Sequence, residues 1–109
     1  TFHKHAGKLC SGIQIHVEAA AYTHESFRPW RLIALALKSL RILQPGYELW
    51  RDFPYEYERD RRAIDLISGS ELLRCWVDDP AAEPGDLENS SSADEARWLS
   101  ERESLLLYR

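Results

Sequence analysis

Hydrophobic and polar residues alternate near the start of the chain. Ile13, Ile15 and Val17 fall on one side of an extended segment, and Gln14 and His16 fall on the other. Alternation with a period of two is typical of a β-strand that buries one face. We therefore predict a strand here, with His16 as a hydrogen-bonding group that faces either the sheet surface or a cleft.

A helical pattern follows over residues 27–43. Apolar side chains cover most of the helical circumference, and the pattern ends before Pro45. The polar stripe of Arg31, Lys38 and Arg41 is narrow. A helix with so wide an apolar surface is expected to be buried on two sides. We predict that it is the core helix of the domain.

The second half of the chain has shorter patterns. We predict a short strand at residues 48–51, a buried helical turn at 64–67 and a helix at 71–78. Residues 79–92 are rich in proline, glycine, serine and acidic residues, which predicts a mobile acidic loop. A last helix is expected over residues 93–107.

These elements predict an α+β fold in which a long buried helix packs across a small mixed sheet, with two or three further helices beside it. The 109 residues form a single domain with one core. The chain opens at Thr1 without an initiator methionine, so we expect it to be a piece of a longer protein. Its localisation then depends on the rest of that protein, and is periplasmic or extracellular if a signal peptide is present.

Composition and charge exclude some functions. The net charge is −4, and the chain is nearly neutral before residue 78 and acidic after it, which argues against nucleic acid as a partner. The sequence has no apolar run long enough to cross a membrane. Cys10 and Cys75 lie far apart in the sequence and lack a metal-binding spacing, so we favour two free thiols. A disulfide between them is the alternative. We expect neither a metal nor a cofactor, and the oligomeric state is not readable from the pattern.

Candidate chemistry concentrates in residues 52–70, which mix aromatic rings, arginines and acids. Hydrolysis of a glycosidic bond needs two carboxyl groups several ångströms apart, one of which keeps its proton near neutral pH. Tyr55 and Tyr57 suit stacking on a sugar, and their apolar surface can raise the pKa of a nearby carboxyl group. Glu56 is the candidate catalytic residue, although a salt bridge to one of the arginines is an open alternative for both Glu56 and Asp65. Of the five carboxylates in residues 52–70, the candidates for this chemistry are Glu56, Glu58, Asp60 and Asp65.

Several motifs occur in a defined order along nearly the whole chain. They are Lys4-x-Ala6-Gly7-x-x-Cys10-x-Gly12-Ile13-Gln14-Ile15-His16-Val17, Phe27-Arg28-Pro29, Trp50-Arg51, Pro54-Tyr55-Glu56-Tyr57, Ala63-Ile64-Asp65-Leu66-Ile67-Ser68-Gly69-Ser70, and Leu106-Leu107-Tyr108. Together they resemble the C-terminal part of a bacterial family, formerly a domain of unknown function, that includes exo-β-N-acetylmuramidases. These glycoside hydrolases remove terminal N-acetylmuramic acid from peptidoglycan fragments.

The resemblance implies a larger N-terminal Rossmann-like domain in the parent protein, a cleft between the two parts, and the main catalytic carboxylate in that N-terminal domain. It implies that this chain forms part of the substrate cleft, binds a peptidoglycan-derived sugar and is inactive alone. The alternative is a non-catalytic module that binds a sugar or a partner. The candidate substrate-binding residues that match the family motifs are His16, Arg28, Tyr55, Glu56, Tyr57 and Asp65. Among these, Asp65 is also expected to serve as a structural anchor.

Overall fold

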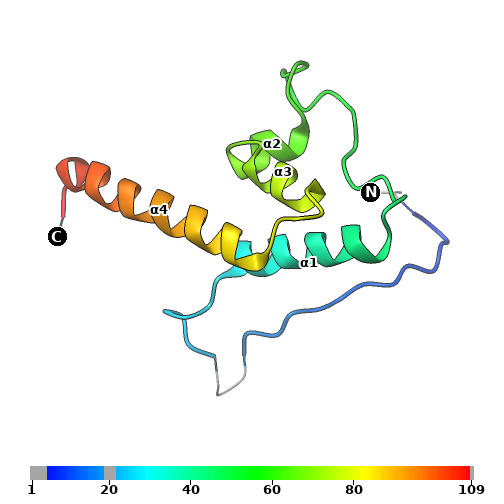
Figure 1. Ribbon diagram of the computed structural model, residues 1–109, viewed down its shortest axis with the longest axis horizontal. Helices are drawn as coiled ribbons and strands as arrows, with labels where there is room; N and C mark the ends of the chain where they lie inside the picture. Colours follow the sequence, from blue (N-terminus) through cyan, green and yellow to red (C-terminus); the bar gives the residue numbers. More distant parts are fainter. Residues whose placement is uncertain (1–4, 19–21, 109) are drawn as a thin grey trace.

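The computed structural model describes residues 5–18 and 22–108, and its regular elements are all helical (Figure 1). In chain order they are α1 (Pro29–Leu43), α2 (Ala63–Ser68), α3 (Leu72–Asp78), α4 (Pro84–Arg102) and a single 3-10 turn, η1 (Glu103–Leu105). Within these described residues no strand forms, so the predicted mixed sheet is wrong.

The segment before α1 shows why the sheet prediction fails. Residues 8–18 have no regular secondary structure, and Ile13 is 78% exposed. A strand needs a neighbouring strand whose backbone groups complete the hydrogen-bond ladder. Residues 48–51, expected to supply one, form no ladder, and the isolated bridge in the described part of the chain joins Tyr55 and Glu58. Alternation identifies side chains that suit a strand, but it does not supply the partner.

Helix α1 ends where the sequence predicts, but it is buried on one side rather than two. Pro29 occupies its first turn, and the N–H of Gln44 closes its last turn on Leu40 O at 2.8 Å. Ala34 is fully buried, whereas Leu43 is 73% exposed and Ile42 is 67% exposed. Much of the apolar surface of α1 is therefore left uncovered in this structure.

The polar stripe of α1 faces its neighbours. Arg31 contacts Glu88 and Glu95 of α4 at 3.1 and 2.8 Å, and Arg41 Nε contacts Asp78 Oδ1 at the end of α3 at 2.9 Å. Long cationic side chains can reach polar groups at helix ends while their stems pack on apolar surface. The stripe is therefore the contact face of the helix.

Lys38 is the most buried member of this stripe, with 6% of its surface exposed. Its ammonium donates to Trp76 O at 2.9 Å, to Val77 O at 3.5 Å and to Asp79 O, and it lies 5.1 Å from the centroid of the Trp76 ring. The last carbonyl groups of a helix have no partner within that helix and carry partial negative charge. Lys38 thus caps the C-terminal end of α3 from α1.

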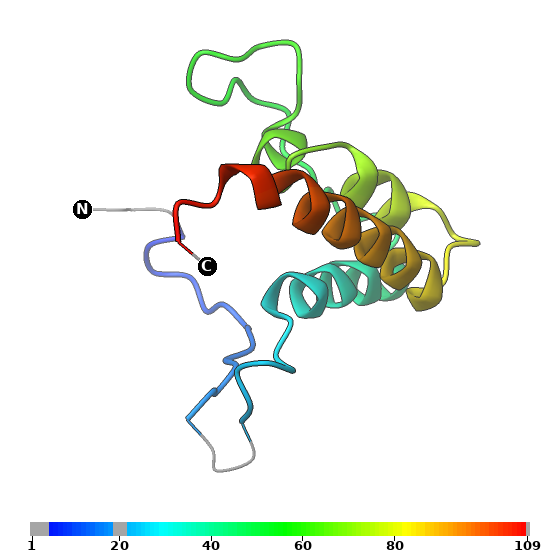
Figure 2. The ribbon, with the colours of Figure 1, turned by 90° about the vertical axis from the view of Figure 1, so that its left-hand side faces the viewer.

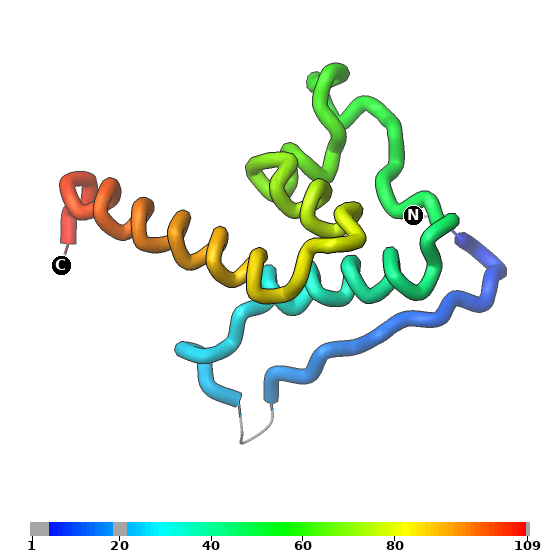
Figure 3. The backbone as a smooth tube through the Cα atoms, viewed as in Figure 1, coloured from blue at the N-terminus to red at the C-terminus, as the bar shows by residue number. Residues whose placement is uncertain are grey.

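The core is small and lies where α1, α3 and the start of α4 meet. Its buried residues are Ala34, Trp50, Leu73, Trp76, Val77 and Leu87. The radius of gyration is 17.2 Å, against about 13 Å for a compact domain of this length. The excess reflects segments that project from the core: the segment before α1, the loop before α2 and the distal half of α4 (Figures 2 and 3).

Helix α4 begins earlier than predicted. Pro84 occupies its first turn, and Glu83 and Asp86 form a capping box in which Asp86 Oδ2 accepts the Glu83 N–H at 2.8 Å. Residues 84–92 are therefore helical rather than part of an acidic loop. Proline and glycine are usually read as loop signals, but a proline directly after a capping residue starts a helix.

We expect Lys38→Met to lower the free energy of unfolding by about 3 kcal/mol, because buried carbonyl groups that lose a donor cost about 1–3 kcal/mol each. The measurement is urea denaturation with linear extrapolation. The control is Ser39→Ala on the exposed side of the same helix, where Ser39 Oγ bonds only within α1; its effect should stay within about 0.5 kcal/mol. Equal effects of the two substitutions would show that the cap contributes nothing.

Candidate functional site

The loop between α1 and α2 forms a tight turn at its outer end. Tyr55 N–H donates to Glu58 O at 3.2 Å, and Glu58 N–H donates to Tyr55 O at 3.0 Å. Between them, Glu56 has a left-handed backbone with φ 53°. A side chain other than glycine in this conformation costs about 1–2 kcal/mol and needs support from its surroundings. The turn therefore holds a strained residue at the position predicted to be chemically active.

The Glu58 carboxylate supplies part of this support. Its Oε1 accepts the backbone N–H groups of Arg59 and Asp60 at 3.1 and 3.0 Å, and its Oε2 accepts two guanidinium N–H groups of Arg61 at 3.1 and 2.8 Å. The Asp60 N–H, followed by the Arg61 guanidinium, lowers the pKa of Glu58. Glu58 is therefore held as a carboxylate and is a poor proton donor.

A shallow hollow of about 310 Å³ lies against the turn, lined by Tyr55, Glu56, Tyr57, Glu58 and Leu66. Tyr57 is 99% exposed, and Tyr55 is half-buried. The turn projects above the helices, and both Figure 1 and Figure 2 show it standing clear of them. The structure thus brings Tyr55, Glu56 and Tyr57 together on one exposed surface.

Asp65 has a different environment. Its carboxylate receives Arg74 Nε at 2.8 Å and Arg74 Nη2 at 2.9 Å, and its side chain is 12% exposed. This pair raises the pKa of Arg74, mainly through the side-chain hydrogen bond. Because Asp65 belongs to α2 and Arg74 to α3, their ion pair joins the two helices, and Arg74 also contacts Glu71, the residue before α3, at 3.2 Å. The geometry makes Asp65 an anchor that fixes the C-terminal end of the loop.

His16 and Arg28 lie away from the turn. His16 belongs to the segment before α1, which runs below that helix in Figure 1, whereas the loop rises above α2. The Arg28 guanidinium donates to backbone carbonyl groups of Glu25 and Phe27, next to it in the chain. The six candidate residues therefore do not form one cleft within this structure.

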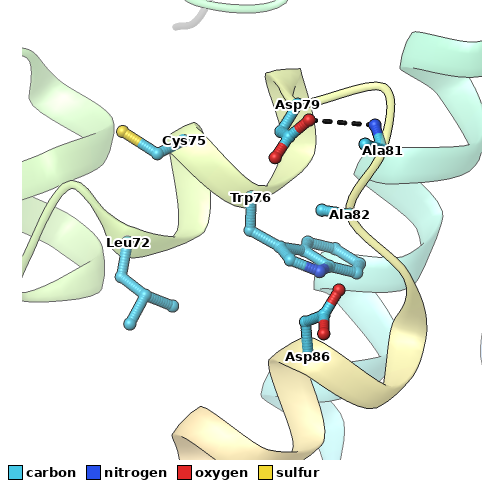
Figure 4. Close-up of a pocket in the computed structure, with 7 residues that line it drawn as sticks. All are labelled: Leu72, Cys75, Trp76, Asp79, Ala81, Ala82 and Asp86. Carbon is cyan, nitrogen blue, oxygen red and sulfur yellow. Dashed lines mark hydrogen bonds between the residues drawn. The ribbon is translucent and has the colours of Figure 1, made fainter.

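A second hollow, of about 400 Å³, lies between α3 and the start of α4 (Figure 4); it is lined by Leu72, Cys75, Trp76, Asp79, Ala81, Ala82 and Asp86. Its polar groups already have local partners. Asp79 accepts the Ala81 N–H at 2.9 Å, Asp86 caps α4, and Trp76 Nε1 donates to Glu83 O at 2.9 Å. The hollow therefore offers a ligand little beyond apolar contact.

Within residues 5–18 and 22–108, no group of three or more His, Cys, Asp or Glu side chains has a metal-binding arrangement. Cys10 and Cys75 are exposed free thiols. In the same part of the chain, no helix has the length and apolar character needed to span a membrane.

Comparison with known proteins decides the family. The model of the family described as exo-β-N-acetylmuramidase NamZ, C-terminal, matches residues 1–108. The chain belongs to the NamZ C-terminal family. It is thereby assigned to a glycoside hydrolase domain family. Searches of curated proteins and of solved structures gave no significant match.

Two sets of contacts that position the loop between α1 and α2 in this NamZ-family chain cannot be predicted from the sequence. Trp50 Nε1 donates to Asp78 Oδ2 at 2.7 Å, which fixes the start of the loop on the end of α3. The sequence marks Glu58 as one of several carboxylates, whereas in the structure it organises the turn. The spacing of three residues between Glu58 and Arg61 is the sequence feature that indicates their ion pair. No sequence feature indicates the hydrogen bonds from the Arg59 and Asp60 N–H groups.

Proposed function

We propose that this chain forms one wall of the substrate cleft in a glycoside hydrolase that releases terminal N-acetylmuramic acid from peptidoglycan fragments, as in cell-wall recycling. The observation that carries the proposal is the family match over residues 1–108. The Tyr55–Glu58 turn supports it, because it presents aromatic surface and a carboxylate side by side, a combination that suits a sugar.

The proposed roles follow from the local geometry. Tyr57 stacks on a pyranose ring, Tyr55 forms the base of the hollow, and Glu56 contacts the sugar next to the scissile bond. In the described part of the chain Glu56 takes part in no ion pair, unlike Glu58 and Asp65. We leave His16, Arg28 and Asp65 out of this surface, because they lie elsewhere or serve the scaffold.

The proposal requires a second carboxyl group, since glycosidic hydrolysis uses a pair. We infer that this group comes from the N-terminal Rossmann-like domain of the parent enzyme, which would close the cleft over the turn. The chain alone then binds sugar weakly and does not turn it over.

Titration with the methyl β-glycoside of N-acetylmuramic acid tests the binding surface. We expect NMR signals of Tyr55 and Tyr57 to shift, and Tyr57→Ala to weaken binding about tenfold, the effect of an aromatic contact of about 1.4 kcal/mol. The matched control is Tyr108→Ala, a tyrosine that is 89% exposed outside the turn. Equal binding by both variants and the unsubstituted chain would remove the turn from the site.

Turnover tests the role of Glu56. In a complete enzyme that carries this domain, Glu56→Gln keeps the size of the side chain and the demand on the backbone but removes the acid. If Glu56 exchanges a proton with the substrate, kcat should fall about 100-fold or more. Unchanged kcat and KM would exclude Glu56 from the reaction, and circular dichroism of the variant should match that of the parent.

A second candidate function is a non-catalytic module that binds a sugar or a partner domain and has no activity of its own. The exposed side of α1 favours it, because this surface is apolar and uncovered: Leu32, Ile33, Leu35, Leu40, Ile42 and Leu43. The N-terminal domain of the parent enzyme is the proposed partner, so this role is compatible with the first.

Sedimentation of the isolated chain tests this second function. An uncovered apolar helix face should drive self-association, and Leu43→Lys should shift the chain toward monomer by placing a charge on that face. Glu103→Lys, which makes a larger charge change at an exposed position away from α1, should leave the association unchanged. A clean monomer at all concentrations would count against an unfilled docking surface.

A further inference from the structure

Glu58 divides its two carboxylate oxygens between two tasks. Oε1 accepts the N–H groups of Arg59 and Asp60, and Oε2 accepts the guanidinium of Arg61. These contacts begin directly after the backbone bridge that joins Tyr55 to Glu58. One side chain therefore fixes the direction in which the chain leaves the turn.

The turn has few other supports among the described residues. It projects from the helical body, and Tyr57 at its outer end is almost fully exposed. Glu56 holds a left-handed backbone that relaxes readily unless its neighbours are fixed. The two backbone hydrogen bonds of the bridge fix one side of the turn, and the Glu58 carboxylate fixes the other.

We propose that Glu58 is the positioning residue of the candidate sugar-binding turn, holding Tyr55, Glu56 and Tyr57 in the arrangement that receives the sugar. This inference rests on the proposed function for the identity of the ligand. Glu58 also lines the hollow, but its proposed role is to position the turn rather than to bind the sugar. It acts through the backbone of the residues that follow it.

Because the contacts of Glu58 depend on its charge, the order of the turn is expected to depend on pH. Backbone and guanidinium hydrogen bonds favour the carboxylate and lower the pKa of Glu58. Their support is fully present above the ordinary pKa of glutamate, about 4.3, and is lost as the pH falls through the lowered value. Arg61 is the charged side chain in contact with the carboxylate in the described structure. The side chains of Glu56, Arg59 and Asp60 flank it in sequence, and Leu66 of α2, beside the hollow, is uncharged.

The test compares Glu58→Gln with Glu71→Gln in the 109-residue chain. Both glutamates pair with an arginine three residues later, Glu58 with Arg61 and Glu71 with Arg74, but only Glu58 holds a turn. In the unsubstituted chain, the amide NMR shifts of Arg59 and Asp60 should titrate with Glu58 at acidic pH. In Glu58→Gln this titration should vanish, order parameters of the turn should fall, and affinity for the methyl β-glycoside of N-acetylmuramic acid should drop about tenfold. Glu71→Gln should change none of these.

Glu58→Asp provides a rescue, because an aspartate can accept the N–H of the residue two positions on. We expect it to restore most of the order of the turn and of the affinity that Glu58→Gln loses. Unchanged turn order in Glu58→Gln, or loosened turn order with unchanged affinity, would overturn the positioning role. If the unsubstituted chain does not bind the glycoside at all, the proposed function fails, and the amide titration still shows separately whether Glu58 orders the turn.

Discussion

The contact between Lys38 and the C-terminal end of α3 is the interaction on which the rest of the structure depends. Helix α3 has seven residues, too few to be stable as an isolated helix. The residue four positions after Trp76 is Pro80, which has no N–H, so Lys38 supplies the donor for the Trp76 carbonyl group, whereas Asp79 O also accepts the Ala82 N–H at 3.2 Å. The Trp76 ring covers the same ammonium, so the charge and the aromatic core residue stabilise each other. The Lys38 side chain thus donates hydrogen bonds to carbonyl groups at the end of α3 and attaches this helix to α1.

From α3 the dependence extends to the candidate site. Asp78, at the end of α3, binds the indole N–H of Trp50 and so fixes the start of the loop. Arg74, on the same helix, holds Asp65 and so fixes the end of the loop. Both ends of the projecting loop are thus attached to one short helix by acid–donor pairs. Between them the described loop has the Arg51–Phe53 cation–π contact and the backbone bridge of its own turn, so the local contacts of Glu58 contribute to holding it.

The sequence predicts the position of α1 and the chemical character of residues 52–70, but not the direction in which α1 faces. Because apolar residues cover most of its circumference, the hydrophobic periodicity predicts a helix buried on two sides. The narrow polar stripe that contains Lys38 gives no sign in the sequence that it is the contact face. In the structure that stripe makes the contacts, because the end of α3 offers carbonyl groups that only a donor can satisfy. The hydrophobic pattern of a helix describes only that helix. It does not show which polar groups on the neighbouring element need hydrogen-bond donors.

The same limit applies to the strand and to the site. The alternation of residues 13–17 is real, but a ladder needs a second chain segment, which a pattern in one segment does not provide. For the site, Tyr55, Glu56 and Tyr57 line one hollow because they are neighbours in a turn, and their role as substrate contacts stays a prediction. His16 and Arg28 depend on tertiary arrangement, and the structure leaves them on other parts of the molecule.

The carboxylates of the loop differ in whether they form an ion pair with an arginine, and this difference affects which of them suits glycosidic hydrolysis. Asp65 and Glu58 each form an ion pair with an arginine, an arrangement that suits an anchor. Glu56 has no such partner among the described residues. A glycosidase needs two carboxyl groups whose environments push their pKa values apart. The turn supplies one carboxyl group, that of Glu56, and a covering domain that brings a second carboxyl group would complete the pair. The exposed position of the turn is therefore what the proposed role requires of this domain.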